Sequence, residues 1–583
     1  MAATETFDHI DVSALFSDAS VREAACTQVS QELDTSDARK QALKRHHNSL
    51  SPISQLPVEL FIEIFQYHMD NQSSLKKKII ITHVCSSWRQ IALAYPSFWN
   101  DLPDDCVAWA FEMLKRSEMA PLTVSLPLLD MTYFNRTEDT PSGSDLTKAV
   151  LEQLSRIRQL SVIQYSYFLH DAMGKALSYL AGPAPLLETL TIHAQDLKLS
   201  AWMLPKDFQA PRLIHLELDG CSLDWTLSPL PYSLRTLNVD LPELILDDFM
   251  SALSQMPSLE DLSIRAFPDR TVTPLGCIVT LLRLTSLSVE SDLLSCTKLF
   301  AGLTYPISTC VKVRCYIFDS PIITGIRSLA QILGNNIGTI KHLSISGRGL
   351  HHLEASTHCP SPLRSNLRQP SRPDLHFELA SAIDVPSEVT IMSEFLTFLS
   401  LQNLEELWLF KNGFDRDTLI GHFGHLKLLR TLVSKSEPAI LAALSSGISL
   451  ELSAEMPPTQ PGTLKFRGLR RLHLINSNFS GSYNFGEILT HCLEKRRERG
   501  SPLHRLYVRE HGYSITLLQK SKLERVVGQF IWRTTELMSD GHEDLSSDSE
   551  SELTDVEEDL QWRDASVSDD DVVLEMDALN LEH

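Results

Sequence analysis

The sequence lacks the features that carry a protein out of the cell or into a membrane. Its first residues contain no basic stretch followed by an apolar core, which a secretory signal needs. No apolar run approaches the roughly 20 residues that cross a bilayer. The ten cysteines among 583 residues are scattered, and none has Cys-x-x-Cys spacing. We therefore expect free thiols in a reducing compartment, which predicts a cytoplasmic or nuclear protein without a membrane partner.

Motifs for catalysis are also missing. The sequence has no Gly-x-Ser-x-Gly and no His-Glu-x-x-His, and Glu487 follows the pair Gly481 and Gly486 where a phosphate-binding loop requires lysine. The one cluster of histidine and cysteine lacks the paired spacing of a zinc site; it consists of His351, His352, His358 and Cys359. We expect no catalytic residue, no metal and no cofactor, and hence a protein that is not an enzyme.

Charge is concentrated at the C-terminus. The chain carries a formal charge of −22, and residues 539–583 hold 17 acidic residues against Arg563 alone. Such a segment cannot bury enough apolar surface to offset the entropy of ordering, so residues 539–583 are predicted to be a disordered acidic tail. The acidic balance makes nucleic acid an improbable partner, because phosphate binding needs cationic side chains.

One apolar pattern recurs along most of the chain. It is L-x-x-L-x-L, with valine or isoleucine sometimes replacing leucine, and its spacing is about 25 residues in the early copies. Clear copies begin at Ile157, Leu187, Leu213, Leu234, Leu259, Leu284, Ile340, Leu404, Leu469 and Leu503. Weaker candidates include Val311–Cys315, Leu375–Leu379, Leu429–Leu432 and Ile448–Leu452.

The alternation in L-x-L predicts a short strand with its leucines on one face. Residues 244–256, between two copies, have apolar side chains at helical spacing. A strand, a turn and a helix every 25 residues or so resemble the irregular leucine-rich repeats of intracellular proteins. Three copies also match the polar position of that repeat, with Cys221, Asn412 and the variant Gln195. The alternative is a single α/β domain with leucine-rich parallel strands.

A second pattern lies near the N-terminus. Its first half contains Leu-Pro-Val-Glu-Leu from Leu56 to Leu60, and its second half contains Val-Cys-Ser-Ser-Trp-Arg from Val84 to Arg89. The combination resembles the F-box, particularly the form abundant in mushroom-forming fungi. The matching positions are Leu56, Pro57, Glu59, Leu60, Ile64, Phe65, Val84, Cys85, Trp88, Arg89, Ala92, Pro96 and Trp99. The segment from Asp70 to Lys78 makes the link between the two halves longer than in a compact F-box.

The same residues have a physical interpretation. Pro57 suits the first turn of a helix, where its missing N–H costs nothing. A domain this small leaves apolar surface uncovered, which suits docking to a partner helix. The resemblance implies that this surface binds a Skp-type adaptor through Leu56, Pro57, Leu60, Ile64, Val84 and Trp88. The alternative is a plain helical cap on the repeats.

Together the resemblances predict an α/β protein with a small all-helical F-box, a leucine-rich-repeat solenoid and the acidic tail. The predicted boundaries are residues 1–50 for a partly disordered or helical N-terminal segment, 51–102 for the F-box, 120–538 for the solenoid and 539–583 for the tail. They imply the substrate-recognition subunit of a cullin–RING (SCF-type) ubiquitin ligase, whose repeats bind a target protein. The alternative is a leucine-rich-repeat scaffold that is not coupled to ubiquitination. A third class, a leucine-rich immune or signalling sensor, would usually carry a nucleotide-binding domain or a secretion signal, and we find neither pattern in the sequence.

Strand residues that flank the leucines point to the opposite face of the sheet. In the early copies these are mostly acidic: Glu217, Asp219, Asp240, Asp261 and Glu290, with Arg265 the exception. In the late copies they are aromatic and basic: Trp408, Phe410, Arg471, His473, Arg505, Tyr507 and Arg509. An exposed aromatic pair beside arginines predicts an interface for an acidic or phosphorylated partner. The alternative is a merely solvated face with Trp408 under a loop.

Overall fold

The computed structural model describes most of the chain outside the two ends. The described residues are 19–70, 79–104, 106–128, 142–164, 170–194, 202–226, 230–241, 244–266, 277–317, 322–348, 350–357, 374–381, 388–410, 413–435, 438–446, 463–475, 485–511 and 516–535. The predicted acidic tail therefore lies outside them, as do His358, Cys359, Asn412 and Gln195. The chain divides into two compact units, Met1–Leu187 and Glu188–His583, a division that falls inside the predicted solenoid.

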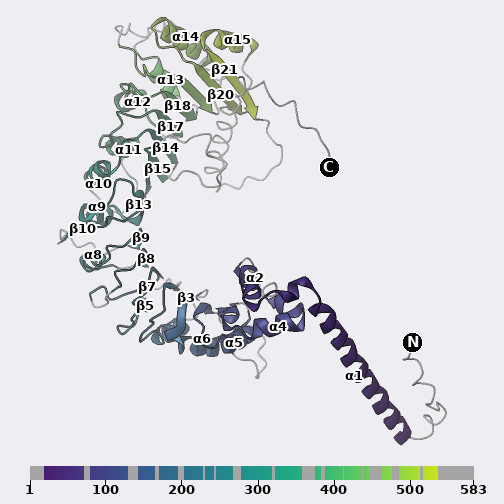
Figure 1. Ribbon diagram of the computed structural model, residues 1–583. Helices are drawn as coiled ribbons and strands as arrows, with labels where there is room; N and C mark the ends of the chain where they lie inside the picture. Colours follow the sequence, from purple (N-terminus) through teal and green to yellow (C-terminus); the bar gives the residue numbers. More distant parts are fainter. Residues whose placement is uncertain are drawn as a thin grey trace. The chain divides into compact units, whose positions relative to one another are not determined.

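Unit 1 combines helices, of which Figure 1 labels α1, α2, α4, α5 and α6, with a small parallel sheet. Its helices are α1 (Ala19–Ser49), η2 (Pro52–Gln55), α2 (Val58–Asp70), η3 (Ile80–His83), α4 (Ser86–Leu93), η4 (Pro96–Trp99), α5 (Val107–Arg116), α6 (Gly143–Leu151), η6 (Leu154–Arg156) and α7 (His170–Ser178). Its strands are β1 (Asp101–Leu102), β2 (Leu122–Leu128) and β3 (Ile157–Gln164), with β2 paired in parallel to both others. The predicted helical region between residues 51 and 102 is thus present.

Aromatic side chains form the core between α2 and α4. Phe61 and Phe65 lie one turn apart on α2 and are 3% and 0% exposed. The Trp88 ring packs against both, with centroids at 5.7 Å from Phe61 and 5.0 Å from Phe65, and the Phe98 ring also packs against Phe65, with centroids 5.7 Å apart. These contacts, which bury large apolar rings, hold the two helices together.

Unit 2 repeats strands and helices. Its strands are β4 (Thr189–Ala194), β5 (Trp202–Met203), β6 (His215–Asp219), β7 (Cys221–Ser222), β8 (Thr236–Leu241), β9 (Asp261–Ala266), β10 (Val279–Thr280), β11 (Ser286–Asp292), β12 (Leu303–Thr304), β13 (Cys310–Ile317), β14 (His342–Arg348), β15 (Leu350–Ser356), β16 (Leu375–Ser381), β17 (Glu406–Phe410), β18 (Thr431–Lys435), β19 (Arg471–Ile475), β20 (Arg505–His511) and β21 (Gln529–Thr535). Its helices are α8 (Leu246–Leu253), α9 (Leu293–Gly302), α10 (Ile322–Asn336), α11 (Glu388–Leu396), α12 (Arg416–Phe423), α13 (Pro438–Leu444), α14 (Phe485–Glu498) and α15 (Leu517–Val526).

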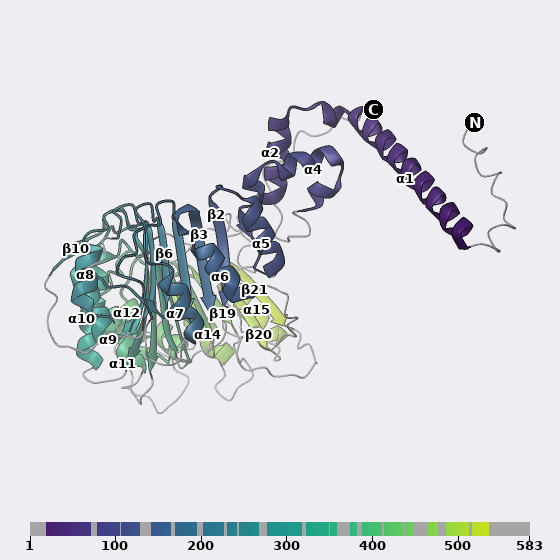
Figure 2. The same ribbon diagram turned by 90° about the horizontal axis from the view of Figure 1, so that it is seen from below.

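Parallel pairing in unit 2 aligns the leucines of successive copies. Leu216, Leu237, Leu262 and Leu287 are partners across β6, β8, β9 and β11, and each is at most 1% exposed. Figure 2 shows β6 within a row of strands that lie side by side, with α8, α9 and α10 along one side of the row. We call the side of the sheet away from the helices the far face. Burial of a leucine row supplies about 2 kcal/mol per side chain, which explains why the motif dictates the register.

Every copy of the motif that falls in the described residues forms a strand, so the strand predictions are confirmed. The weaker candidates around Val311, Leu375 and Leu429 are β13, β16 and β18, and the helix predicted for residues 244–256 is α8. The candidate at residues 448–452 lies outside the described part. Helix α4 begins at Ser86, so Val84 lies before the helix and not on it.

One departure from regular pairing lies near the middle of unit 2. Strand β15 runs antiparallel to β14 on one side and to β16 on the other. Beyond this insertion β16 pairs in parallel with β13, and β14 pairs in parallel with β17. The insertion brings β15 side chains beside those of β16 on the far face.

None of the helices in the described ranges is both long enough and apolar enough to span a membrane. The nine cysteines that the structure describes are all free thiols. Cys221, at the polar position of its repeat, is fully buried, and burial raises the pKa of its thiol to about 12.

Candidate functional site

Helix α2 in unit 1 presents an apolar ridge to solvent. We define the ridge as Leu56, Pro57, Leu60 and Ile64. Leu60 and Ile64 are 41% and 40% exposed and lie one turn apart on the same face of α2. Leu56 is half-buried, and the Pro57 carbonyl accepts hydrogen bonds from Leu60 N and Phe61 N at the start of the helix.

The ridge exists because the helix has two apolar faces. Phe61 and Phe65 fill the core, and the residues one position earlier, Leu60 and Ile64, are rotated about 100° away from it. An amphipathic helix of a self-contained domain would place charged residues there. The apolar choice leaves uncovered surface, which is typical of a docking site.

Two residues predicted to bind the adaptor need separate descriptions. Val84 is 55% exposed, as a docking residue requires. Trp88 is half-buried with its ring packed against both Phe61 and Phe65, so much of this ring belongs to the core. The sequence analysis did not include Val58 and Ile80, two further apolar residues that are 51% and 55% exposed. Their apolar side chains, close in sequence to the F-box matches Pro57 and Val84, could have indicated them.

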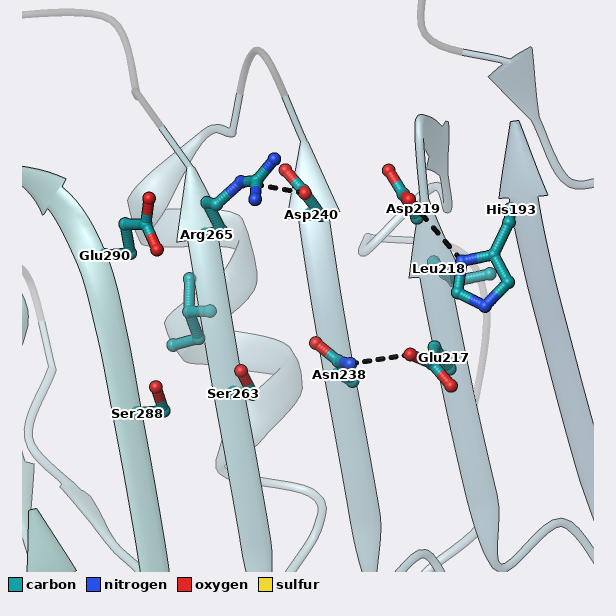
Figure 3. Close-up of a pocket in the computed structure, with 11 residues that line it drawn as sticks. His193, Glu217, Leu218, Asp219, Asn238, Asp240, Ser263, Arg265, Ser288 and Glu290 are labelled. Atoms are coloured by element: carbon teal, nitrogen blue, oxygen red, sulfur yellow. Dashed lines mark hydrogen bonds and ion pairs between the residues drawn. The ribbon is translucent and has the colours of Figure 1, made fainter. Parts of the chain in front are cut away.

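The far face of unit 2 is acidic over β6 to β11. Figure 3 shows Glu217, Asp219, Asp240 and Glu290 on neighbouring strands, around a small pocket of about 200 Å³. The prediction that the flanking acidic residues face away from the leucines is confirmed there. Arg265 Nε lies 2.8 Å from Asp240 Oδ2, and Asn238 Nδ2 donates to Glu217 Oε1 at 2.8 Å.

Electrostatics on this part of the far face favour a cation. Burial raises the pKa of Asp240; Arg265 acts against this, and Asp219 and Glu290 add to it. A nearby positive charge stabilises the ionised form of a carboxyl group that lies beside other carboxylates. The pocket is therefore suited to a cationic side chain of a partner.

The far face over β17 to β20 differs from the prediction. Trp408, His473 and Tyr507 are 4%, 4% and 7% exposed, so the expectation of an exposed aromatic surface is wrong for these three. These residues lie in one row across β17 to β20, in which Trp408 is paired with Val433, Val433 with His473, and His473 with Tyr507. Bulky side chains in one row cover one another, and the rings of His473 and Tyr507 stack with centroids 5.5 Å apart.

Burial also changes the charge expected of His473. Burial lowers the pKa of His473 to about 4, and Arg505 and Arg471 act in the same direction. The imidazole is therefore neutral near pH 7 and does not add a positive charge to the face. Phe410 is half-buried against the cluster of Trp408, Val433 and Ile475.

Two of the predicted arginines instead lie in a basic groove. The groove has a volume of about 990 Å³ and lies where β17 to β21 begin. Its cationic residues are Lys427, Arg430, Arg470, Arg471 and Arg505, with His504 beside them and Glu405 and Glu406 at one end. Arg509 is at the opposite end of β20 from Arg505 and does not line it.

In-register pairing explains why the cations gather. Arg470 N and Arg471 N both donate to Arg430 O, and His504 N and Arg505 N both donate to Arg470 O. Equivalent positions of successive strands are therefore stacked, about 4.8 Å apart. Gly468 allows the close approach of backbone here, since a Cβ would lie 2.3 Å from Lys427 O. Sequence reasoning missed Lys427, Arg430, Arg470 and His504 because they precede the strands; the pairs Arg470–Arg471 and His504–Arg505 were the signal.

No model of a known protein family matches the chain, and no curated protein matches its sequence. Function is therefore inferred from the residues and their geometry.

Proposed function

We propose that the chain is a non-catalytic receptor subunit of a cullin–RING ubiquitin ligase, in which unit 1 binds a Skp-type adaptor and unit 2 binds a target protein. The observation that carries the proposal is the apolar ridge on α2, exposed above a complete aromatic core. The resemblance to the F-box implies that the partner of this ridge is a Skp-type adaptor. Adaptor binding by purified protein is the test, and its design is given in the Discussion.

The leucine-rich-repeat assignment is supported by three features of unit 2. The leucines of successive copies are partners in parallel strands, a helix directly follows each of eight strands from β8 to β20, and Cys221 is buried at the polar position. Proteins of this kind bind partners through the extended sheet surface. We place the target on the far face and at the basic groove beside it.

The groove favours an acidic or phosphorylated segment of the target. Five cationic side chains against two carboxylates give it positive charge, while the chain as a whole is at −22. Arginine recognises carboxylate and phosphate through paired N–H donors, which adds geometric specificity to the attraction.

Reversing the charge of two groove residues should weaken binding of an acidic peptide. Arg430 and Arg471 are exposed, and we expect the double variant Arg430→Glu/Arg471→Glu to lose about tenfold in affinity, or about 1.4 kcal/mol. The probe is a fluorescent peptide of residues 543–560, with and without phosphate on Ser549 and Ser551, measured by anisotropy at low salt. The matched control is Arg212→Glu/Arg283→Glu, two exposed arginines far from the groove along the chain. Equal losses in both double variants would contradict a specific groove.

The acidic tail supplies a further test. Ser546, Ser547, Ser549, Ser551 and Thr554 lie among carboxylates, a context that acidophilic casein-type kinases favour. If the tail competes for the groove, deleting residues 539–583 should strengthen peptide binding several-fold at low salt, with the difference disappearing at high salt because exposed charges are then screened. Unchanged affinity at low salt would indicate a tail that only aids solubility.

A further inference from the structure

Two histidines and a glutamate meet on the far face at the antiparallel insertion. His352 and Glu354 are two residues apart on β15 and so share a face, and His376 on β16 is the direct cross-strand partner of Glu354. Among the described residues, these three offer ligand atoms close enough together to hold a metal ion. The expectation of no metal considered only neighbours along the chain, and 22 positions separate Glu354 from His376.

The three ligand atoms form a nearly regular triangle. His376 Nδ1 lies 3.2 Å from Glu354 Oε1 and 3.2 Å from His352 Nε2, and His352 Nε2 lies 3.6 Å from Glu354 Oε1. Donors around a tetrahedral zinc ion with bonds of about 2.0–2.1 Å are separated by about 3.3–3.4 Å. Adjacent donors of an octahedral ion with similar bonds are only about 3.0 Å apart, so the triangle fits the tetrahedral ion better.

The second ring nitrogen of each histidine also has a polar neighbour outside the triangle. Ser346 Oγ lies 3.4 Å from His352 Nδ1, which leaves Nε2 directed at the other two ligands. His376 Nε2 lies 4.0 Å from Glu378 Oε2, and Glu378 is held by Arg314 Nε at 2.8 Å. Metal-bound histidines typically donate their second N–H to such an outer partner, which fixes the tautomer. His352 Nε2 is 3.2 Å from both nitrogens of His376, and the contact with Glu354 selects Nδ1 as the ligand.

We propose that His352, Glu354 and His376 form a Zn²⁺ site with three protein ligands and a fourth position open to solvent or to a partner's side chain. The three side chains are 25%, 33% and 20% exposed, so an ion can enter and the fourth position is accessible. The site faces the same side of the sheet as Trp408, because Ser344 is paired with both Glu354 and Trp408. A bound ion would also join β15 to β16.

The protonation of the ligands agrees with this arrangement. Burial, followed by the neighbouring His376, lowers the pKa of His352, so its imidazole is neutral near pH 7. Burial alone would raise the pKa of Glu354, but the hydrogen bond with His376 and the nearby histidines hold it below its usual value. Neutral imidazole and ionised carboxylate are the forms that bind a metal. Lys312, beside His376 on β13, is the cation that opposes binding, while Arg314 is paired with Glu378 and Glu290.

Cobalt(II), a spectroscopic substitute for Zn²⁺, tests the proposal in the full-length chain after treatment with a chelator. The wild type should bind one Co²⁺ per chain with visible bands of a tetrahedral ion and without an intense near-ultraviolet thiolate band, and Zn²⁺ should displace it. His352→Asn and Glu354→Gln should each lower the affinity at least about tenfold, and Ser346→Ala about tenfold through the outer partner. The matched control is His193→Asn, a half-exposed far-face histidine on β4, which should bind as the wild type does.

The site would be overturned by a lack of saturable binding at micromolar Co²⁺, by wild-type affinity in Glu354→Gln, or by equal losses in His193→Asn and His352→Asn. A dominant thiolate band would assign the ion to cysteine and also refute the proposal. Circular dichroism of the metal-free variants shows whether each is folded. If His352→Asn does not fold, the comparison of Glu354→Gln and Ser346→Ala with the wild type decides the question.

Discussion

Replacing Leu60 by Asp is expected to lower the affinity of the chain for a Skp-type adaptor by at least about 30-fold. Leu60 is 41% exposed at the centre of the ridge, and adaptor binding would remove it from water. Placing a carboxylate in that desolvated contact costs about 2 kcal/mol or more, at about 1.4 kcal/mol for each factor of ten. Titration of purified adaptor into the wild type and the variant, followed by calorimetry, measures the loss.

A matched control separates docking from folding. Gln66→Asp places the same charge on the exposed opposite flank of α2 and should bind the adaptor as the wild type does. Both variants should melt at the wild-type temperature, since neither position is in the core. Equal adaptor affinity in the Leu60→Asp variant and the wild type would refute the F-box assignment. Loss of binding together with a large fall in melting temperature would show instead that Leu60 is needed for folding.

Replacing Phe65 by Ala is expected to have the largest effect on the stability of unit 1. The side chain is fully buried between Phe61, Trp88 and Phe98. Truncating a buried phenylalanine costs about 3–5 kcal/mol, because apolar contact is lost and a cavity remains. Hydrogen exchange of residues 58–99, followed by mass spectrometry, should become about a hundredfold faster or more at about 1.4 kcal/mol per decade.

Ile64→Ala is the corresponding control on the same helix. Ile64 is 40% exposed, so its truncation removes much less buried surface than that of Phe65 and should accelerate exchange by about tenfold or less. The strands of unit 2 should be protected equally in all three proteins, because repeats contact mainly their neighbours. Similar acceleration in the Phe65→Ala and Ile64→Ala variants would mean that the aromatic cluster is not the core of this region.

The strands of unit 2 could be predicted from the sequence because a strand with one buried face has a period of two. Leu237, Leu262 and Leu287 mark three strands and also their register, since a slip of one residue would turn the leucines out of the core. Strand β21 escaped prediction because Gln529–Thr535 contains no leucine. Strand β15 was not predicted because it is an antiparallel insertion between β14 and β16, and the repeat pattern indicates only successive parallel strands.

The candidate sites were only partly predictable. Period two gives the direction of a side chain but not what lies beside it, so Trp408, His473 and Tyr507 were expected to be exposed, although their neighbours across the sheet cover them. The basic groove depends on residues that precede strands from different copies, such as Arg430 and Arg470, and only the register brings them together. Trp88 matched the F-box pattern, yet its ring belongs to the core.

The measurement that tests the central claim most directly is a binding isotherm of the purified full-length chain with a purified Skp-type adaptor. Our account predicts saturable binding with one adaptor per chain, and co-elution of the two proteins in gel filtration. Absence of a complex at tens of micromolar of each protein, with unit 1 shown to be folded by hydrogen exchange of α2 and α4, would contradict it and would favour a leucine-rich-repeat scaffold that is not coupled to ubiquitination.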